Sequence, residues 1–371
     1  MIKQSFFTIC LLLTTTVIFS QELDLIRSNR LILGTDESRS ASVSAGDLNG
    51  DGSIDLVIAN GRHWPQANKI FINNGFGIFT ISKDLDNIEE TSYATELADF
   101  NNDGYLDIAV GNDMAPNALY RNDGKGNFTK VGSFGIEYAP TRNLLTTDID
   151  SDGDIDILIT NRGEVNEICL NNGNGIFSET VTFGSKDDST IDVAVADING
   201  DGHQDLILAN RDGQQNYIYL NNGKLNFNQD IPFGTGKDET RSVGIGDLNN
   251  DGFLDIITAN INESNIIYFG DEKNGFDKSV VFDNVDSPSY SLDIGDIDGN
   301  GSLDIVIANS RAPNILFLNQ ENGTKWTPIS LADESLATYD IIFTDLNTDG
   351  RLDIVESNSD AINRYYFNRG N

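Results

Sequence analysis

The stretch Asp47-Leu48-Asn49-Gly50-Asp51-Gly52-Ser53-Ile54-Asp55 decides the fold of this 371-residue chain, because its pattern occurs seven times. The pattern has Asp at positions one and nine, Asp or Asn at positions three and five, and Gly at position six. A period near fifty residues predicts a propeller or a solenoid, in which each repeat forms one supersecondary unit. Successive copies start 49 to 52 residues apart, at Asp47, Asp99, Asp148, Asp197, Asp247, Asp296 and Asp345.

The residues around each loop predict four antiparallel strands per repeat. Apolar residues alternate with others before the loop, as at Val193 and Val195, and an apolar run follows it, as at 56–59. An Asn ends that run in every repeat, and a second Asn begins a third segment. A turn rich in Asn and Gly, such as 171–175, leads to a fourth. These units predict an all-β fold, a seven-bladed β-propeller with four-stranded antiparallel blades.

The two ends of the chain predict how the ring closes. The sequence stops after the third strand of the last repeat, at 364–367, while a spare segment at 29–33 precedes the first repeat. This N-terminal segment is therefore expected to complete the last blade, which leaves no open edge in the ring. A β-helix is the alternative, but its repeats are shorter and need no exchange of ends. Gly34 lies 13 residues before its loop, as do Gly135, Gly184 and Gly234.

The nine-residue loops have the donor set of a calcium site. Hard oxygen ligands in a short loop with a Gly turn suit Ca²⁺, with side chains at positions one, three, five and nine and a carbonyl at position seven. Seven matching copies favour about seven structural Ca²⁺ ions over a catalytic metal, which keeps an open coordination position. An Asp-rich turn without metal is the remaining alternative. The predicted ligands are Asp47, Asn49, Asp51, Asp55, Asp99, Asn101, Asp103, Asp107, Asp148, Asp150, Asp152, Asp156, Asp197, Asn199, Asp201, Asp205, Asp247, Asn249, Asp251, Asp255, Asp296, Asp298, Asn300, Asp304, Asp345, Asn347, Asp349 and Asp353.

The charge balance excludes several classes of partner. Asp and Glu total 58 against 24 Lys and Arg, a formal net charge of −34. Such a surface repels nucleic acid and anionic membranes. Carboxylates clustered in the loops also repel one another, so we expect marginal folding without calcium.

The first twenty residues predict export. Lys3 supplies a basic start, an apolar run covers 6–19, and cleavage is expected near Ser20, which leaves a propeller over 21–371. The run is short for a membrane anchor, so no membrane insertion is predicted. Export to the periplasm or the extracellular space follows. Cys169 is then the one cysteine of the mature chain, placed in an apolar segment as a buried hydrophobe.

The face opposite the calcium loops carries the candidate ligand site. Loops after the second strands share this face with the segments that lead into the first strands. Arg pairs with carboxylate or sulfate, and aromatic rings stack on sugars. An acidic glycan is therefore the predicted ligand, although these arginines could instead pair with local Asp and Glu. The residues are Arg39, Arg62, His63, Trp64, Arg142, Arg162, Arg211, Arg241, Arg311, Tyr93, Tyr138, Tyr290 and Tyr339.

One extension of this hypothesis is catalytic. His63 lies in the longest insertion, 61–67, and His with Tyr can act as base and acid beside a uronate carboxylate. A polysaccharide lyase acting by β-elimination is therefore an alternative to a binding module. No nucleophile motif or zinc cluster in the sequence favours a hydrolase. His203 falls inside the fourth loop, where only its carbonyl is expected to serve.

The loops and the dipeptides Phe183-Gly184 and Phe233-Gly234 resemble FG-GAP/VCBS repeats, found in integrin α-subunits and bacterial secreted proteins. The resemblance implies the propeller and calcium. Members bind proteins or glycans, or cleave polysaccharides, so it does not select one activity. Some secreted ulvan and rhamnose–glucuronate lyases are similar, but no catalytic motif matches residue by residue. Adhesion to an extracellular protein, by a monomeric soluble module, is the other alternative.

Overall fold

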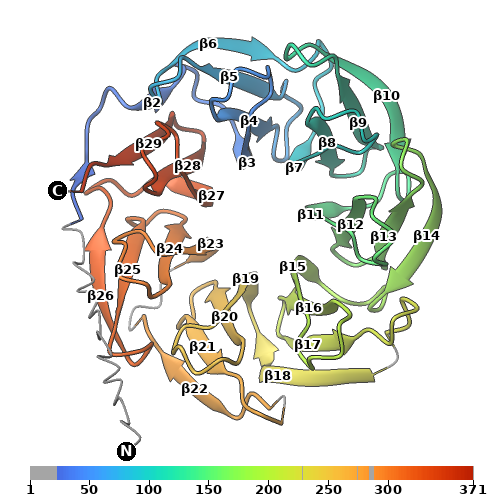
Figure 1. Ribbon diagram of the computed structural model, residues 1–371, viewed down its shortest axis with the longest axis vertical. Helices are drawn as coiled ribbons and strands as arrows, with labels where there is room; N and C mark the ends of the chain where they lie inside the picture. The colour runs from blue at the N-terminus through green and yellow to red at the C-terminus, as the bar shows by residue number, and fades with distance from the viewer. Residues whose placement is uncertain (1–22, 228, 274, 284–287, 371) are drawn as a thin grey trace, which may run out of the picture.

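The computed structural model describes residues 23–227, 229–273, 275–283 and 288–370. Its strands form seven antiparallel sheets around a central axis, with no helix among the described residues (Figure 1). The predicted all-β, seven-bladed propeller is thereby confirmed. The predicted signal peptide, 1–20, lies outside these residues. In the part of the chain that is described, no helix is long and apolar enough to cross a membrane.

Each blade runs from an inner strand at the axis to an outer strand at the rim (Figure 1). The inner strands are β3 (Ser40–Gly46), β7 (Ser92–Ala98), β11 (Thr141–Thr147), β15 (Thr190–Ala196), β19 (Thr240–Gly246), β23 (Ser289–Gly295) and β27 (Ala337–Thr344). The second strands are β4 (Asp55–Asn60), β8 (Asp107–Asn112), β12 (Asp156–Asn161), β16 (Asp205–Asn210), β20 (Asp255–Asn260), β24 (Asp304–Asn309) and β28 (Asp353–Ser359).

The outer half of each blade is less regular. The third strands are β5 (Lys69–Asn73), β9 (Asn117–Asn122), β13 (Asn166–Asn171), β17 (Gln214–Leu220), β21 (Ile266–Phe269), β25 (Ile315–Gln320) and β29 (Asn363–Asn368). The outer strands are β6 (Phe79–Asp84), β10 (Phe128–Phe134), β14 (Phe177–Phe183), β18 (Gln229–Asp238), β22 (Lys278–Val281) and β26 (Lys325–Ser330), with β1 (Leu25–Ile26) and β2 (Ile32–Leu33) on the seventh blade.

The hydrophobic core lies between the blades. Every residue of the second strands is buried, which explains their continuous β-branched runs. Seven apolar clusters form, one at each interface between neighbouring blades. Cys169 belongs to the cluster between blades two and three, where burial raises the pKa of its thiol to about 12. It is the buried hydrophobe that the sequence predicts.

The N-terminal segment closes the ring on the seventh blade, as predicted, but in two pieces. Both β1 and β2 pair with β29, so the blue and red ends of the chain meet in Figure 1. The prediction of one strand over 29–33 is wrong in its bounds. A turn in which the Leu31 amide donates to the Ser28 carbonyl interrupts the pairing, and the strand resumes at Ile32.

Buried hydroxyl groups join the blades on one face of the ring. Ser40 at the start of β3 accepts a hydrogen bond from Asn363 of the seventh blade (3.0 Å) and donates to Asn60 of its own blade (2.9 Å). The equivalent Ser92 links Asn68 to Asn112. At five of the seven blade boundaries the two Asn residues bond through a shared Ser or Thr, whereas the relay is incomplete at Asn117 and Asn210, whose Nδ2 and Oδ1, respectively, have no partner among the described residues.

This relay predicts the effect of removing one hydroxyl. Ser40→Ala removes the hydroxyl that bonds the Oδ1 of Asn60 and the Nδ2 of Asn363, both buried, at the boundary where the ring closes. We expect a loss of about 2 kcal/mol in the free energy of unfolding, measured by urea denaturation. The exposed Ser82→Ala is the control, with no expected change. A Ser40 variant as stable as the parent would contradict a bonded relay.

Candidate functional site

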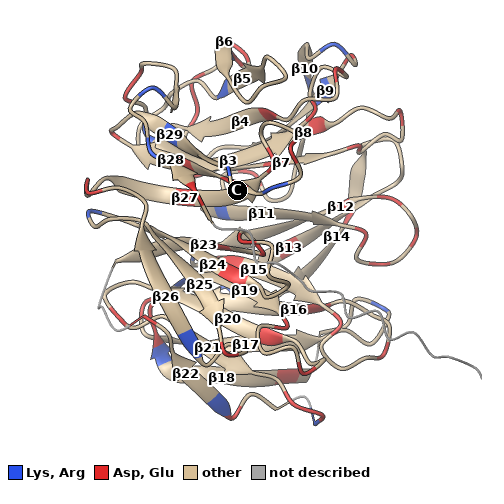
Figure 2. Ribbon diagram, turned by 60° about the vertical axis from the view of Figure 1, so that its left-hand side comes forward, with Lys and Arg blue, Asp and Glu red and all other residues tan. Residues whose placement is uncertain are grey.

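The seven acidic loops, residues one to nine of each repeated pattern, share one backbone geometry. Figure 2 shows Asp and Glu in red on many loops of the ring, with Lys and Arg in blue at fewer places. The first Asp accepts hydrogen bonds from the amides at positions five and six, as Asp47 does from Asp51 and Gly52. The same two bonds occur in all seven loops. Gly52 has φ of +85°, which a side chain would strain. The loop backbone thus orients the carboxylates of each loop toward one another.

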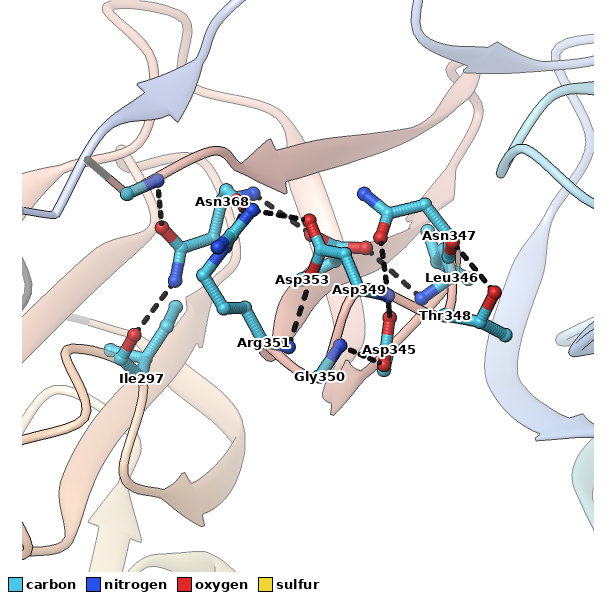
Figure 3. Close-up of polar contacts among 11 residues, drawn as sticks. Ile297, Asp345, Leu346, Asn347, Thr348, Asp349, Gly350, Arg351, Asp353 and Asn368 are labelled. Atoms are coloured by element: carbon cyan, nitrogen blue, oxygen red, sulfur yellow. Dashed lines mark hydrogen bonds and ion pairs between the residues drawn. The ribbon is translucent and has the colours of Figure 1, made fainter.

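The ninth residue and the second residue of each loop connect it to the rest of the ring. In the seventh loop, Asp353 accepts from the amides of Leu346 (3.0 Å) and Asn368 (2.8 Å), as Figure 3 shows. The Leu346 side chain is fully buried between blades seven and one. Its carbonyl accepts from Asn73 of blade one (2.7 Å), and the Asn368 side chain donates to Ile297 of blade six (2.7 Å).

This connection recurs around the ring. The ninth Asp accepts from a third-strand amide in all seven blades. The carbonyl at position two accepts from an Asn of the next blade at five interfaces. Gly270 stands where the fifth blade has its counterpart of this Asn, so that blade has no side chain to donate. Five of the seven loops are therefore bonded to the next blade as well as to their own.

The donor atoms fit a bound cation. Asp148, Asp150 and Asp156 of the third loop each place a carboxylate oxygen within 4.8 Å of the others, as do the equivalent residues of the sixth loop. Calcium–oxygen distances of about 2.3–2.6 Å allow oxygens this far apart to share one ion. In the second loop, one carboxylate oxygen of the fully buried Asp107 has no hydrogen-bond partner. A cation would satisfy this oxygen.

Burial makes the ninth Asp of the loops hard to ionise without a cation. Burial, together with the charges of the neighbouring loop carboxylates, raises the pKa of Asp55, Asp107 and Asp255 to about 6. For Asp156 and Asp353 the pKa reaches about 7 for the same reasons. The buried ninth carboxylates are therefore harder to ionise than an ordinary Asp, and a bound cation would stabilise their charged form.

The opposite end of the axis is lined by one residue from each inner strand. These residues lie six positions before the first Asp of each loop, where the pairing register with the second strand shifts by a β-bulge. The bulge turns the side chain toward the axis. All seven line one pocket of about 80 Å³, which we call the axial mouth: Ala41, Tyr93, Arg142, Ile191, Arg241, Tyr290 and Tyr339.

Arginines and tyrosines stack in pairs around the axial mouth. Arg241 lies 4.3 Å from the ring centre of Tyr290, and Tyr290 packs edge-on against Tyr339 at 4.6 Å. Arg62, from the insertion of blade one, lies 3.7 Å from the ring centre of Tyr339. Arg142 lies 4.5 Å from Tyr93. Cations over aromatic faces are attracted by the ring quadrupole, which holds the guanidinium groups in place.

Two of these arginines have no carboxylate partner in the described structure. Arg142 pairs with Asp113 at 2.8 Å. Arg241 makes no ion pair, its Nε is buried without a hydrogen-bond partner, and burial lowers its pKa to about 10. The Nε of Arg62 is also buried and unpartnered, and its Nη1 contacts His63 at 3.0 Å. Among the described residues, Arg62 and Arg241 thus form no ion pair, although Asp192 and Asp340 also line the pocket.

His63 lies at the edge of the mouth. Its Nδ1 is 3.0 Å from the hydroxyl of Tyr93. Burial lowers the pKa of the imidazole, and so do the charges of Arg62 and Arg142. His63 is therefore neutral at pH 7 and able to accept a proton. Its φ of +69° is unusual for a residue with a side chain.

Below the mouth, a channel cavity of about 450 Å³ is lined by acidic residues that link the blades. Asp192 of blade four accepts from Ser242 (2.9 Å) and the Val243 amide (3.0 Å) of blade five. Asp340 of blade seven accepts from Ser291 of blade six and from the amide of Val43 in blade one. These carboxylates therefore hold neighbouring blades together through hydrogen bonds.

The other predicted site residues are not gathered at the mouth. Arg39 pairs with Asp360, and both Arg162 and Arg211 pair with Asp212, so the alternative of local ion pairs holds for these three and for Arg142. Arg311, Trp64 and Tyr138 are exposed. Tyr93, Tyr290 and Tyr339 lie within inner strands rather than in the loops before them, which corrects their predicted position. His203 is exposed, as predicted, and packs against Gly223.

Sequence reasoning missed part of the mouth. Ala41, Ile191, Asn143 and Asp192 line the pocket but were not predicted as site residues. The signal was present, because the lining residues keep one fixed spacing to the first Asp of each loop. What the sequence does not display is the bulge that turns this position inward.

The fold and loops define a seven-bladed β-propeller with an acidic loop in every blade. Six FG-GAP-like repeats match the chain, at residues 47–110, 99–145, 148–208, 197–258, 247–307 and 296–356. The chain belongs to the FG-GAP repeat family. No curated protein matches it.

Solved structures agree on the architecture. BBS1N, crystallised in complex with ARL6DN, is similar with a TM-score of 0.61 and 14% identity over 92% of this chain and 98% of that one. An Agrocybe aegerita lectin that recognises non-reducing terminal N-acetylglucosamine has a TM-score of 0.57 and 19% identity, over 80% and 81% of the two chains. Identities this low show a shared fold and nothing finer.

Glu96, which lines the same channel, generates a prediction about pH. Burial and the nearby charges of Asp340 and Asp192 raise the pKa of this carboxyl to about 8. The folded protein therefore binds the proton more tightly than the unfolded chain, and stability falls as pH rises from the ordinary pKa to about 8. Glu96→Gln should match the parent near pH 5 and exceed it near pH 9 by about 2 kcal/mol, allowing for screening by channel water.

The measurement is urea unfolding in excess calcium at both pH values. Glu272→Gln is the control, because Glu272 is exposed and should give no pH-dependent difference. A Glu96 variant that is equally or less stable than the parent near pH 9 would show that the carboxyl ionises freely in the channel.

Proposed function

We propose that the chain is a calcium-stabilised binding module exported from the cell, with its ligand at the axial mouth and its ions in the acidic loops. Converging carboxylate oxygens in loops three and six and the orphaned oxygen of Asp107 support the metal. The ion would be held by the side chains at positions one, three, five and nine. The positive charge of the ion would favour the ionised form of the buried ninth Asp.

Calcium removal provides the first test. Each ion held at about 100 times its Kd adds about 2.7 kcal/mol to the free energy of unfolding. We expect the Tm in millimolar calcium to exceed that in chelator by at least about 10 °C, measured by differential scanning calorimetry. Magnesium is the matched control and should raise the Tm little above its value in chelator, because it prefers a smaller octahedral site. Equal Tm values with calcium and with chelator would reject a structural ion.

The ligand we propose for the axial mouth is an acidic glycan. The observation that carries this is Arg241, a half-buried arginine whose Nε is buried and unpartnered and which makes no ion pair with the described residues, in a pocket walled by Tyr290 and Tyr339. Arg binds carboxylate and sulfate through two parallel hydrogen bonds, and the tyrosine rings suit the faces of a sugar. An anionic group on a saccharide satisfies both features.

The dimensions of the mouth limit how the ligand is held. A pocket of about 80 Å³ admits one carboxylate or sulfate group, whereas whole-ligand pockets are about 300 Å³ or more. The sugar ring therefore stays above the tyrosines. Asp192 and Asp340 at the floor of the pocket repel a second anion, so the polymer does not thread the channel.

Substitution of Arg241 tests this ligand. Arg241→Gln should weaken binding to a uronate oligosaccharide at least about tenfold, because one charged hydrogen-bonding partner is lost. Arg311→Gln removes a charge from an exposed arginine on the same face and should leave affinity unchanged. Isothermal titration calorimetry with uronate and neutral oligosaccharides makes the comparison. Equal affinity for both sugars, or no effect of Arg241→Gln, would reject the proposed site.

A lyase is the second candidate, and one observation favours it. The neutral His63 contacts the Tyr93 hydroxyl beside Arg62 and Arg142, which places a base, an acid and carboxylate-binding cations together. Incubation with uronate polysaccharides should then produce absorbance from unsaturated uronate, and His63→Ala should abolish it. Binding of the polysaccharide without this absorbance would support the binding module and exclude the lyase.

A protein ligand is the remaining alternative. BBS1N, which shares this architecture, was crystallised with a protein, and the Agrocybe aegerita lectin is described as recognising a sugar, so both kinds of partner occur on the fold. A glycan array on which the chain binds no acidic sugar would favour the protein partner.

A further inference from the structure

The seventh acidic loop differs from the others in containing a cation of its own. Position seven is occupied by Arg351, where the other loops have Ser53, Tyr105, Asp154, His203, Phe253 and Ser302. Arg351 donates from Nη2 to Asp349 at 2.6 Å, and Asp349 is the predicted ligand at position five. Among the ion pairs of the described residues, this is the one that involves a predicted calcium ligand.

A second contact fixes the guanidinium in place. The Nε of Arg351 donates to the carbonyl of Asn368 at 3.2 Å, on the third strand of the same blade (Figure 3). Asn368 in turn donates through its amide to Asp353 and through its side chain to Ile297 of blade six. The Arg351 and Asp349 side chains are 28% and 27% exposed, so water screens the pair only partly.

We propose that Arg351 is a resident cation of the seventh loop, so that this loop binds Ca²⁺ more weakly than the other six and stays ordered without it. The inference rests on the proposed calcium role of the loops. A guanidinium beside the ion repels it and competes for Asp349. The affinity of such sites rises with the negative charge of the ligands. The third loop lies at the other extreme, with Asp154 at position seven in addition to its four ligand carboxylates.

The location of Arg351 relates it to ring closure. Blade seven is the blade completed by the N-terminal strands β1 and β2, which pair with β29. Arg351 contacts the carbonyl of Asn368 at the end of that strand. The closing blade therefore has an internal positive charge at its loop before any ion arrives, and closure of the ring does not depend on the seventh ion.

Native mass spectrometry of the full chain during calcium titration tests the inference. We expect a plateau at six ions, with the seventh binding at least about tenfold more weakly. Arg351→Ser, which installs the residue of loops one and six, should bring the plateau to seven. The same variant should have a lower Tm in chelator than the parent. Arg369→Ser, an equal charge change at an exposed residue outside the loop, should keep the plateau at six.

A second variant covers the case in which Arg351→Ser does not fold. His203→Arg places an arginine at the exposed position seven of the fourth loop and should lower the plateau by one ion. Seven ions of equal affinity in the parent, or a plateau of six in both the parent and Arg351→Ser, would overturn the role of Arg351 and leave the calcium proposal intact. No bound ion at any loop would reject the calcium proposal itself.

Discussion

The ring depends on the second residue of each acidic loop. Its side chain fills the apolar interface with the next blade, its amide donates to the ninth Asp in six of the seven loops, and its carbonyl accepts from the next blade at five interfaces. A single residue thus couples hydrophobic packing, loop geometry and contact between blades. Because the amide holds the ninth carboxylate, any cation in the loop acts on the blade interface as well.

The mouth and the channel below it use charge in opposite ways. Channel carboxylates such as Asp192 have both oxygens occupied by hydrogen bonds from neighbouring blades, so they stabilise the ring and leave little capacity for a ligand. At the mouth, Arg62 and Arg241 are held by aromatic rings instead of carboxylates. A stacked arginine keeps its hydrogen-bond donors available, which is the condition for recognising an anion from solution.

The architecture could be predicted from the sequence because the same pattern recurs in every blade. The ligand site could not be predicted in this way, because the residues that line it vary between blades. A nine-residue pattern with one period gives seven independent observations of the same loop, and the strand order follows from the segments between loops. The mouth offers one observation per blade, and its seven positions hold four residue types: Ala, Tyr, Arg and Ile. Arg142 and Arg241 were found by residue type, but nothing in the sequence distinguished Arg142, which is paired with Asp113, from Arg241, which is not.

The N-terminal closure shows the same limit at a smaller scale. The spacing of Gly34 to its loop places the segment on the seventh blade, and its φ of +70° is shared with Gly184. The turn at 28–31 leaves the spacing of Gly34 to its loop unchanged, but it shifts the register on β29, because Ile26 pairs with Phe367 and Ile32 pairs with Arg364. A pattern of spacing therefore predicts which strands pair but not where their pairing is interrupted.

Variation at the mouth also explains why its shape is asymmetric. Blade one contributes Ala41, the smallest residue of the ring, and the same blade carries the long insertion. Arg62 of that insertion reaches Tyr339 of blade seven, and His63 reaches Tyr93 of blade two, so the insertion spans three blades over the space that Ala41 leaves. Ile191 lies across the ring, in blade four, without such a cover. The mouth is therefore covered on the side of Tyr339 and Tyr93 by the insertion of blade one, whereas Ile191 and Arg241 line its other side.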